Sequence, residues 1–217
     1  MPKVEFPMDW HTRADTRTGS RLHLAIVIRC RSDQFGCRRR LNQRLSKKPH
    51  ERFDELHVGD GLPCVPPTAV RYAGMREYCP FDPDEVIMQG IGPSGAPVTV
   101  RDALIAAVMA GCKPEYMPIL VAIAEAMCDP QYGVEHSGNT PGADTLIILN
   151  GPIVKQLGFN YTQGVLRDGF LPNTSVGRFF RLYLRNIAGF LLQKTDKATF
   201  GNTWRVVLAE NDDVLAN

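Results

Sequence analysis

The sequence lacks the short-range patterns that usually reveal a metal centre or a redox motif. Its six cysteines are widely spread, and no two of them form a C-x-x-C pair. No two of its five histidines have the i, i+3 or i+4 spacing that would put two metal ligands on one helix face. The sequence therefore contains no metal or redox site of the kind that is recognised by the short spacing of its cysteines or histidines. We therefore predict free thiols and no cofactor, and only a metal site assembled from distant residues stays open.

Long hydrophobic runs are also missing. No run approaches the ~20 apolar residues of a membrane-spanning helix, and residues 1–11 contain no apolar core of signal-peptide length. A mean hydropathy of −0.17 is ordinary for a soluble globular protein. We expect a cytoplasmic protein that does not contact a membrane.

The chain has no strong excess of charge of either sign. Lys and Arg number 25 against 23 Asp and Glu, so no global field favours nucleic acid. Basic residues nevertheless crowd between residues 29 and 52, where nine of them stand against Asp33 and Glu51 alone. This segment could contact nucleic acid, bind an anion or dock on an acidic partner. Because Phe35 is its single aromatic residue, we do not expect nucleic acid as a partner.

The length of 217 residues suits one substantial domain with a loosely packed arm. Residues 1–58, which include the basic segment, would form an extended N-terminal arm. Residues 59–217 would form a single α/β domain. We predict a layered domain in which helices flank a small mixed or parallel sheet.

The centre of the predicted domain is a pair of helices joined by a tight corner. An Ala-rich apolar run precedes the corner, and apolar residues recur every three or four positions over residues 116–127, as in an amphipathic helix. Gly111 can adopt the positive φ that ends the first helix. Pro114 suits the first turn of the second helix, where no amide donor is needed.

Three reactive side chains stand at this corner: the thiol of Cys112, the ammonium of Lys113 and the carboxylate of Glu115. Glu115 would lie beside the positive end of the second helix. Two interpretations stay open at this stage. The corner could be part of an active site, or it could be a helical hairpin in the core with Cys112 as a small hydrophobic residue.

A buried strand is predicted over residues 145–149, where a short apolar run is bounded by turn residues. The strand is typical of a parallel sheet, and it leads into a helix that opens at Pro152. Open α/β sheets bind their ligands at the carboxyl ends of their strands. Asn150 and Gly151 follow this strand directly and are therefore our first candidates for a site.

Two further segments are candidates for the same site. Residues 59–68 form a loop in which glycines allow sharp bends and prolines fix φ, so that Asp60 would stand on a rigid support. A helix is predicted from about residue 171 to Gly189, with Asn173 or Thr174 as its N-cap.

The amides in the first turn of that helix could bind an anion, and Arg178 lies one turn further along. The alternative is a capped helix whose arginines face water or a partner. The residues concerned are Arg178, Arg181 and Arg185.

Several segments together resemble the UGSC-type (seleno)protein family, over roughly residues 59–212. The matching text is GDGLP and VPPT within residues 59–68, PSG at 93–95, VMAGCKPEY at 108–116, EAM at 125–127, NGPI and LG within 150–158, and NTSVGR at 173–178. The motif that names the family, a selenocysteine or cysteine followed by Gly-Ser-Cys, is absent from this chain. The resemblance therefore implies a companion domain whose thiol or selenol group is carried on a separate domain or chain.

Two functions are compatible with these patterns. The first is a subunit of a hetero-oligomeric enzyme that acts on a small molecule, most simply by hydrolysis of an activated bond, since amide donors and a carboxylate suffice without a cofactor. The second is a non-catalytic partner subunit of a thiol or selenol redox protein, with the arm and basic segment as its docking surface. Either function requires a second, different protein subunit.

In the first hypothesis, the loops at 60–61, 112–115, 150–151 and 173–178 converge on one pocket. Glu115 would be the acid/base, Asn150 would stabilise a developing anion, and Cys112 would be a nucleophile or a wall. The predicted substrate-binding residues are Asp60, Lys113, Gly151, Asn173, Thr174 and Arg178, the last of them for an acidic or nitro-like group.

Overall fold

A computed structural model describes residues 49–140, 145–199 and 207–215. Its α-helices are α1 (Pro49–Glu55), α2 (Ala69–Arg76), α3 (Val100–Ala110), α4 (Met117–Ala126), α5 (Ile153–Gln156), α6 (Leu171–Tyr183) and α7 (Asp212–Leu215). Its strands are β1 (Val86–Ile91), β2 (Ala96–Thr99), β3 (Ile147–Leu149) and β4 (Val207–Ala209). The shorter elements are the 3-10 turns η2 (Gly92–Ser94), η3 (Pro114–Tyr116) and η4 (Val134–Gly138), and the π-helical turn η5 (Leu184–Ala188).

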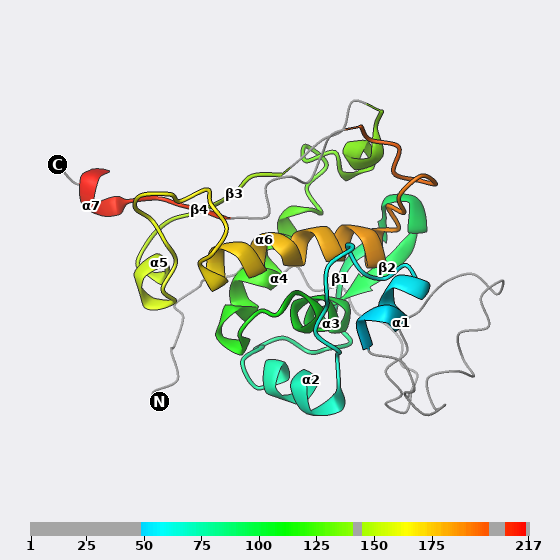
Figure 1. Cartoon of the computed structure of the whole chain (residues 1–217), viewed down its shortest axis with the longest axis horizontal. Coiled ribbons are helices and arrows are strands. Elements are labelled where there is room, and N and C mark those ends of the chain that lie inside the picture. The colour runs from blue at the N-terminus through cyan, green and yellow to red at the C-terminus, as the bar shows by residue number, and fades with distance from the viewer. Residues whose placement is uncertain (1–48, 141–144, 200–206, 216–217) are drawn as a thin grey trace.

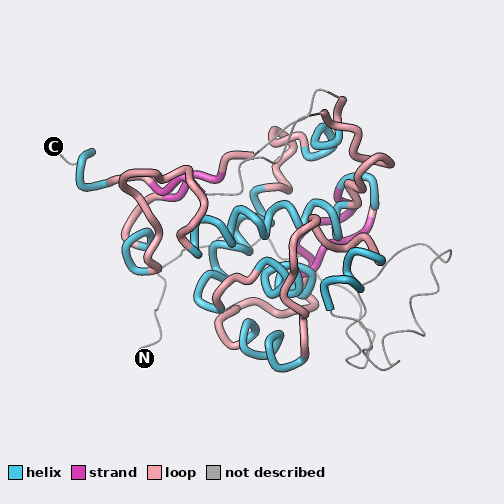
Figure 2. Tube along the Cα trace, viewed as in Figure 1, coloured by secondary structure: helices cyan, strands magenta, loops and turns pink. Residues whose placement is uncertain are grey.

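The elements form an α/β layered domain, as predicted (Figure 1; Figure 2). Helix α6 crosses the middle of the molecule and packs against α3, which in turn contacts α4 and α2. Strand β4 packs against α6 from another side. The core therefore lies mainly between α3 and α6, where Leu104, Phe179 and Leu182 are fully buried.

The strands are divided between two small sheets. Strands β1 and β2 pair antiparallel, and β3 and β4 pair parallel, with Ile147 opposite Val207 and Leu149 opposite Ala209. Strand β3 confirms a parallel strand within the predicted range 145–149, but the predicted burial is wrong, because Ile148 is 57% exposed and Leu146 is 44% exposed. Helix α5 follows after Pro152. Among the described residues each strand has a single neighbour, so neither sheet has a central strand.

The local signals at α3 and at the corner after it are confirmed. The carboxylate of Asp102 accepts hydrogen bonds from the amide (2.9 Å) and the hydroxyl (2.8 Å) of Thr99, which stabilises the start of α3. Gly111 ends α3 with a φ of 78°, in the left-handed region that glycine adopts without strain. Pro114 opens the turn η3, which leads directly into α4.

The predicted cap of the long C-terminal helix is wrong. Helix α6 begins at Leu171, with Phe170 in the N-cap position and without a side-chain cap. Pro172 lies in the first turn, where its missing amide hydrogen costs nothing, so the helix begins earlier than the Asn173 and Thr174 pattern indicated.

Most of the predicted arm lies outside the described residues, and so do Cys30 and Cys37. The described end of that segment is α1, after which Val58 is buried in the core. The boundary between arm and domain at residue 58 stays a prediction. None of the described helices combines the length and the apolar character that crossing a membrane requires.

Candidate functional site

The strongest polar contact of the site joins Asp60 to Arg178. Arg178 donates two hydrogen bonds to the carboxylate, from Nε to Oδ2 at 2.9 Å and from Nη2 to Oδ1 at 2.8 Å. The side chain of Asp60 is 3% exposed and that of Arg178 is 15% exposed. Bonding to this buried carboxylate raises the pKa of Arg178 above its ordinary value. A paired, doubly bonded guanidinium of this kind fixes geometry as well as charge.

Arg178 also fastens the backbone of the loop that carries Asp60. Its Nη2 donates to the carbonyl oxygens of Leu62 at 3.2 Å and Pro63 at 3.1 Å. Asn186, on the π-helical turn, donates from Nδ2 to the carbonyl of Val58 at 2.9 Å. The loop is thus attached at two places to the continuous helical segment made of α6 and η5.

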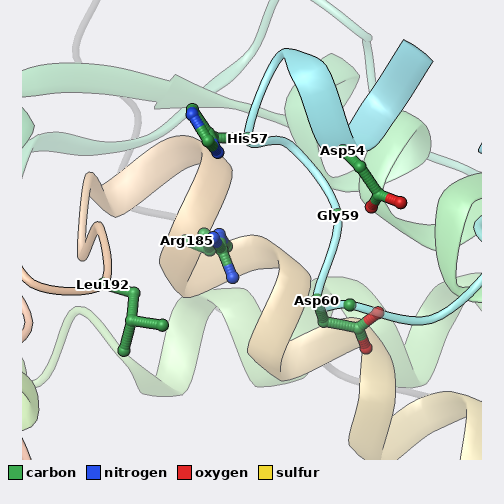
Figure 3. Close-up of a pocket in the computed structure, with 7 residues that line it drawn as sticks. Asp54, His57, Gly59, Asp60, Arg185 and Leu192 are labelled. Atoms are coloured by element: carbon green, nitrogen blue, oxygen red, sulfur yellow. The ribbon is translucent and has the colours of Figure 1, made fainter. Parts of the chain in front are cut away.

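A pocket of about 280 Å³ opens between the loop and the π-helical turn (Figure 3). Its lining residues are Asp54, His57, Gly59, Asp60, Gly61, Arg185 and Leu192. In Figure 3 the side chains of His57, Arg185 and Leu192 lie on one side, and the carboxylates of Asp54 and Asp60 point away from Arg185. The two fastenings of the loop therefore hold one wall of this pocket against the other.

Cys112 is a buried thiol beside the same arginine. Its Sγ donates to the carbonyl of Ser175 at 3.3 Å, which links the corner after α3 to the second turn of α6. Burial raises the pKa of the Cys112 thiol to about 12, although Ser175 and the charge of Arg178 act in the opposite direction. A thiol with this pKa is not ionised at neutral pH, so this geometry suits a wall better than a nucleophile.

The two charged neighbours of Cys112 differ in their surroundings. Lys113 is exposed, whereas Glu115 is half-buried. Oxygen Oε2 of Glu115 is buried and has no hydrogen-bond partner among the described residues. A buried carboxylate oxygen without a hydrogen-bond donor destabilises the folded state. We therefore expect water, a ligand or a second chain to donate a hydrogen bond to this atom.

Asn150 and Gly151 lie at the end of β3, as predicted. Asn150 donates from Nδ2 to Oε2 of Glu210 at 3.1 Å, on an exposed surface. Gly151 has a φ of 87°, which allows the turn into α5. These two residues belong to the edge of the molecule formed by β3, β4 and α5 (Figure 1). They are not among the lining residues of the pocket.

Asn173 is fully buried and holds three backbone groups together. Its Oδ1 accepts from the amide of Asn160 at 2.8 Å. Its Nδ2 donates to the carbonyls of Asn160 at 3.0 Å and Val207 at 2.8 Å. These bonds tie α6 to β4 and to the loop after α5, which is a structural task. The neighbouring Thr174 accepts a hydrogen bond from the amide of Gly169 at 3.2 Å, in an exposed position.

The structure thus brings together part of the predicted site. Asp60 and Arg178 are in direct contact, and Cys112 joins the same helix through Ser175. Asn150 and Gly151 stand apart at the end of β3. The predicted convergence on one pocket is therefore wrong: Asp60 lines the pocket, whereas the other predicted site residues do not, namely Cys112, Lys113, Glu115, Asn150, Gly151, Asn173, Thr174 and Arg178.

The sequence analysis missed the role of two pocket residues. Arg185 had a signal, because it shares a helical face with Arg178 and Arg181. His57 had no such signal, since its position depends on how α1 ends.

No group of three or more His, Cys, Asp or Glu side chains within the described ranges gathers in a way that could hold a metal ion. The described cysteines, which are Cys64, Cys79, Cys112 and Cys128, are all free thiols. No protein-family model matches the sequence, and no curated protein or solved structure matches it either. The resemblance to the UGSC-type family therefore stays a prediction.

Proposed function

We propose that this chain is one subunit of a hetero-oligomeric enzyme that acts on a small molecule, and that it supplies the walls of the binding pocket beside Asp60. The observation that carries the proposal is the buried Asp60–Arg178 pair. It fixes an irregular loop against α6 immediately beside a pocket of about 280 Å³. Irregular loops on rigid supports commonly hold ligands.

Within this proposal the reactive groups are shared between two chains. Cys112 is a buried structural residue and not a nucleophile, because its pKa of about 12 keeps the thiol protonated and it does not line the pocket. Glu115 is the acid/base in this proposal, since its buried Oε2 has no donor among the described residues. It does not line the pocket beside Asp60, so it contributes only if the partner chain extends the site to it. Asn150 lies on the surface near β3, so in this proposal it contributes only if the partner chain extends the site in that direction.

The β3–β4 sheet supports the existence of a second subunit. Parallel sheets are normally covered on both faces, yet Ile148 of β3 is 57% exposed and Leu146 before it is 44% exposed. Phe170 and Leu171, at the start of α6, are exposed large hydrophobic residues as well. A protein partner that covers these side chains would remove apolar surface from water.

The chemistry that we propose is hydrolysis of an activated bond, which a carboxylate can assist without a cofactor. A second candidate is a non-catalytic partner of a thiol or selenol redox protein. It is favoured by one observation: burial raises the pKa of each described cysteine thiol, so the described part of the chain offers no activated sulfur. The redox group would then have to come from the partner.

The test compares the purified full chain, the product of a neighbouring gene, and the mixture of both. Chromogenic activated esters, p-nitrophenyl acetate and p-nitrophenyl phosphate, report hydrolysis. We expect turnover in the mixture, its loss in Glu115→Gln and its retention in Cys112→Ser. Glu135→Gln is the matched control, because Glu135 is an exposed carboxylate. If the two chains co-purify and reduce a disulfide reagent but hydrolyse neither ester, the redox partner function replaces the hydrolase. If they do not associate, both versions fail.

A further inference from the structure

Arg185 is the basic residue of the pocket, and the described part of the chain provides no partner for it. Three arginines follow one face of the α6–η5 segment. Arg178 pairs with Asp60, and Arg181 pairs with Asp196 at 3.2 Å. Arg185 has no hydrogen bond or ion pair within the described part of the chain, and its Nε is buried without an acceptor. A half-buried guanidinium with unused donors is costly unless an acceptor from outside the chain completes it.

The charged groups around Arg185 do not neutralise it, so its surroundings are compatible with a bound anion. Burial, and after it the neighbouring Arg181, lower the pKa of Arg185, whereas Asp60, Asp196 and Cys64 act in the opposite direction. Asp60 and Asp196 are each already paired with an arginine. The carboxylate of Asp54, which is exposed, points away from Arg185 in Figure 3. The excess charge on this side of the pocket is therefore the positive charge of Arg185.

The backbone around Arg185 is also unusual. It lies in η5, a π-helical turn, and π-helical turns occur frequently at functional sites. The turn ends at Gly189, which has a φ of 85°. A regular continuation of α6 would set Arg185 differently with respect to the pocket, so the rare geometry has a direct effect on where its donors lie.

His57, which lies on the same side of the pocket as Arg185 in Figure 3, has a left-handed backbone. Its φ is 56°, a left-handed value that is unfavourable for most residues other than glycine. It ends α1 in the pattern of a Schellman motif, in which the amide of His57 bonds to the carbonyl of Asp54 at 3.0 Å and that of Val58 to Phe53 at 3.1 Å. Glycine would fit this position better. Strain of this kind is retained where a side chain is needed.

The pocket volume limits the size of a ligand. The pocket has a volume of about 280 Å³ and is open to solvent on one side. Leu192 adds an apolar wall. A compact metabolite-sized molecule with a short apolar part fits these limits.

We propose that the pocket binds a small anion, and that Arg185 anchors its carboxylate or phosphate group with the imidazole of His57 as a second donor. This inference rests on the proposed function and names the ligand class of the same pocket. The planar guanidinium suits both groups, because each presents two oxygens that can accept a pair of parallel hydrogen bonds.

The first experiment measures anion binding by the full chain. The melting temperature is followed during titration with inorganic phosphate or with acetate, each against sodium chloride of the same ionic strength. We expect the melting temperature to rise to a plateau with at least one of the two anions. The anion with the lower apparent Kd shows whether the pocket prefers a phosphate or a carboxylate group. Arg185→Gln should weaken that binding about 10- to 100-fold, since it removes a charge-assisted pair of bonds. Arg185→Lys should bind the anion with an affinity between those of the wild type and Arg185→Gln, because lysine keeps the positive charge but cannot donate two parallel hydrogen bonds.

Arg167→Gln is the matched control, because Arg167 is exposed, loses the same charge and does not line the pocket. It also corrects for anions that bind elsewhere, above all on the basic segment at 29–52. The inference is overturned if neither anion stabilises the wild-type chain, or if Arg185→Gln and Arg167→Gln respond alike.

His57→Gly separates binding from stability. Without anion, the variant should melt at the same temperature as the wild type or higher, because glycine relieves the left-handed strain. Its phosphate or acetate binding should nevertheless weaken several-fold. A variant that is more stable and binds equally well would show that His57 is only the end of α1, and the two-donor site would be overturned.

The failure of this inference can be told apart from failure of the proposed function. An active complex whose ester hydrolysis is unaffected by Arg185→Gln and by phosphate keeps the proposed function and overturns the anion site. A chain that binds phosphate through Arg185 but forms no active complex keeps the ligand class and overturns the enzyme function.

Discussion

The Asp60–Arg178 pair provides the sharpest test of the architecture, through the substitution Asp60→Asn. The change keeps the shape of the side chain and removes the charge that Arg178 faces. Breaking a buried ion pair by altering one partner costs about 3–5 kcal/mol, because the remaining charge is left uncompensated. Arg178 keeps its bonds to the carbonyls of Leu62 and Pro63, so we expect the lower end of that range, about 3 kcal/mol.

The loss is measured by urea unfolding of the full chain, with thermal melting as a second readout. For a chain of 217 residues, about 3 kcal/mol corresponds to a melting temperature lowered by about 6–12 °C. Asp213→Asn is the matched control. Asp213 also pairs with a cation, Lys155, but the two side chains are 58% and 51% exposed, so its loss should cost about 0–1 kcal/mol.

A double-mutant cycle with Arg178→Met then isolates the coupling between the two side chains. We expect the double variant to be less destabilised than the sum of the two single variants, by about 2 kcal/mol, within the range seen for contacting residues. The reasoning is refuted if Asp60→Asn costs no more than Asp213→Asn, or if the two substitutions are additive. The loop would then be held by other contacts.

Three further predictions concern burial elsewhere in the domain. Iodoacetamide at pH 8 should leave Cys112 unmodified in the native chain and modify it in urea, because the thiol is buried and its pKa is about 12. Peptide mass spectrometry follows the reaction, and equal rates of modification in both conditions would contradict this prediction. Asn173→Ala should lower the free energy of unfolding, measured in urea, by at least ~3 kcal/mol, since three buried backbone groups lose their partners. Thr174→Ala should lower it by about 1 kcal/mol or less, and similar losses for the two variants would refute the structural role of Asn173. Burial raises the pKa of Glu125, with the charge of Glu85 adding to the effect, so folding favours its protonated form and stability falls as pH rises through that pKa. Glu125→Gln should therefore gain stability relative to the wild type between pH 4 and pH 7, and a gain that is independent of pH would argue against the burial.

The elements that the sequence predicted correctly depend on local chemistry. Gly111 ends a helix because only glycine adopts its φ without strain, and Thr99 begins one because its amide and hydroxyl meet Asp102 three residues later. The strand at 147–149 was visible because apolar residues stand between turn residues. Each of these signals operates over a few residues, and packing did not override them.

The wrong cap of α6 has a physical explanation of the same kind. Asparagine and threonine accept hydrogen bonds from free amides, whether these belong to a helix start or to another segment. Asn173 uses this capacity across the fold, where its Oδ1 accepts from the amide of Asn160 while its Nδ2 donates to the carbonyl of Val207, and no local pattern distinguishes this use from a cap. The partition of the strands into two sheets was equally invisible, because pairing partners such as Leu149 and Ala209 are 60 residues apart.

The candidate site could not be predicted from local patterns either, because it depends on contacts between distant residues. The three arginines of the α6–η5 segment illustrate this. They are the same residue type on one helical face, and Arg178 was the predicted ligand-binding residue because it lies nearest to the amides at the start of the helix. In the fold, buried carboxylates that come from distant segments satisfy two of them: Asp60 pairs with Arg178, and Asp196 pairs with Arg181. A guanidinium already bonded on two sides has little left for a substrate, since any new acceptor must first displace a carboxylate. Among the described residues Arg185 has no acceptor for its donors, and a pocket lies beside it, so an anion that binds there would pair with its charge and break none of the ion pairs described above. The residue best suited to bind a ligand is therefore the arginine that the fold leaves unpaired, while the arginine that looked most suitable in the sequence holds the wall in place.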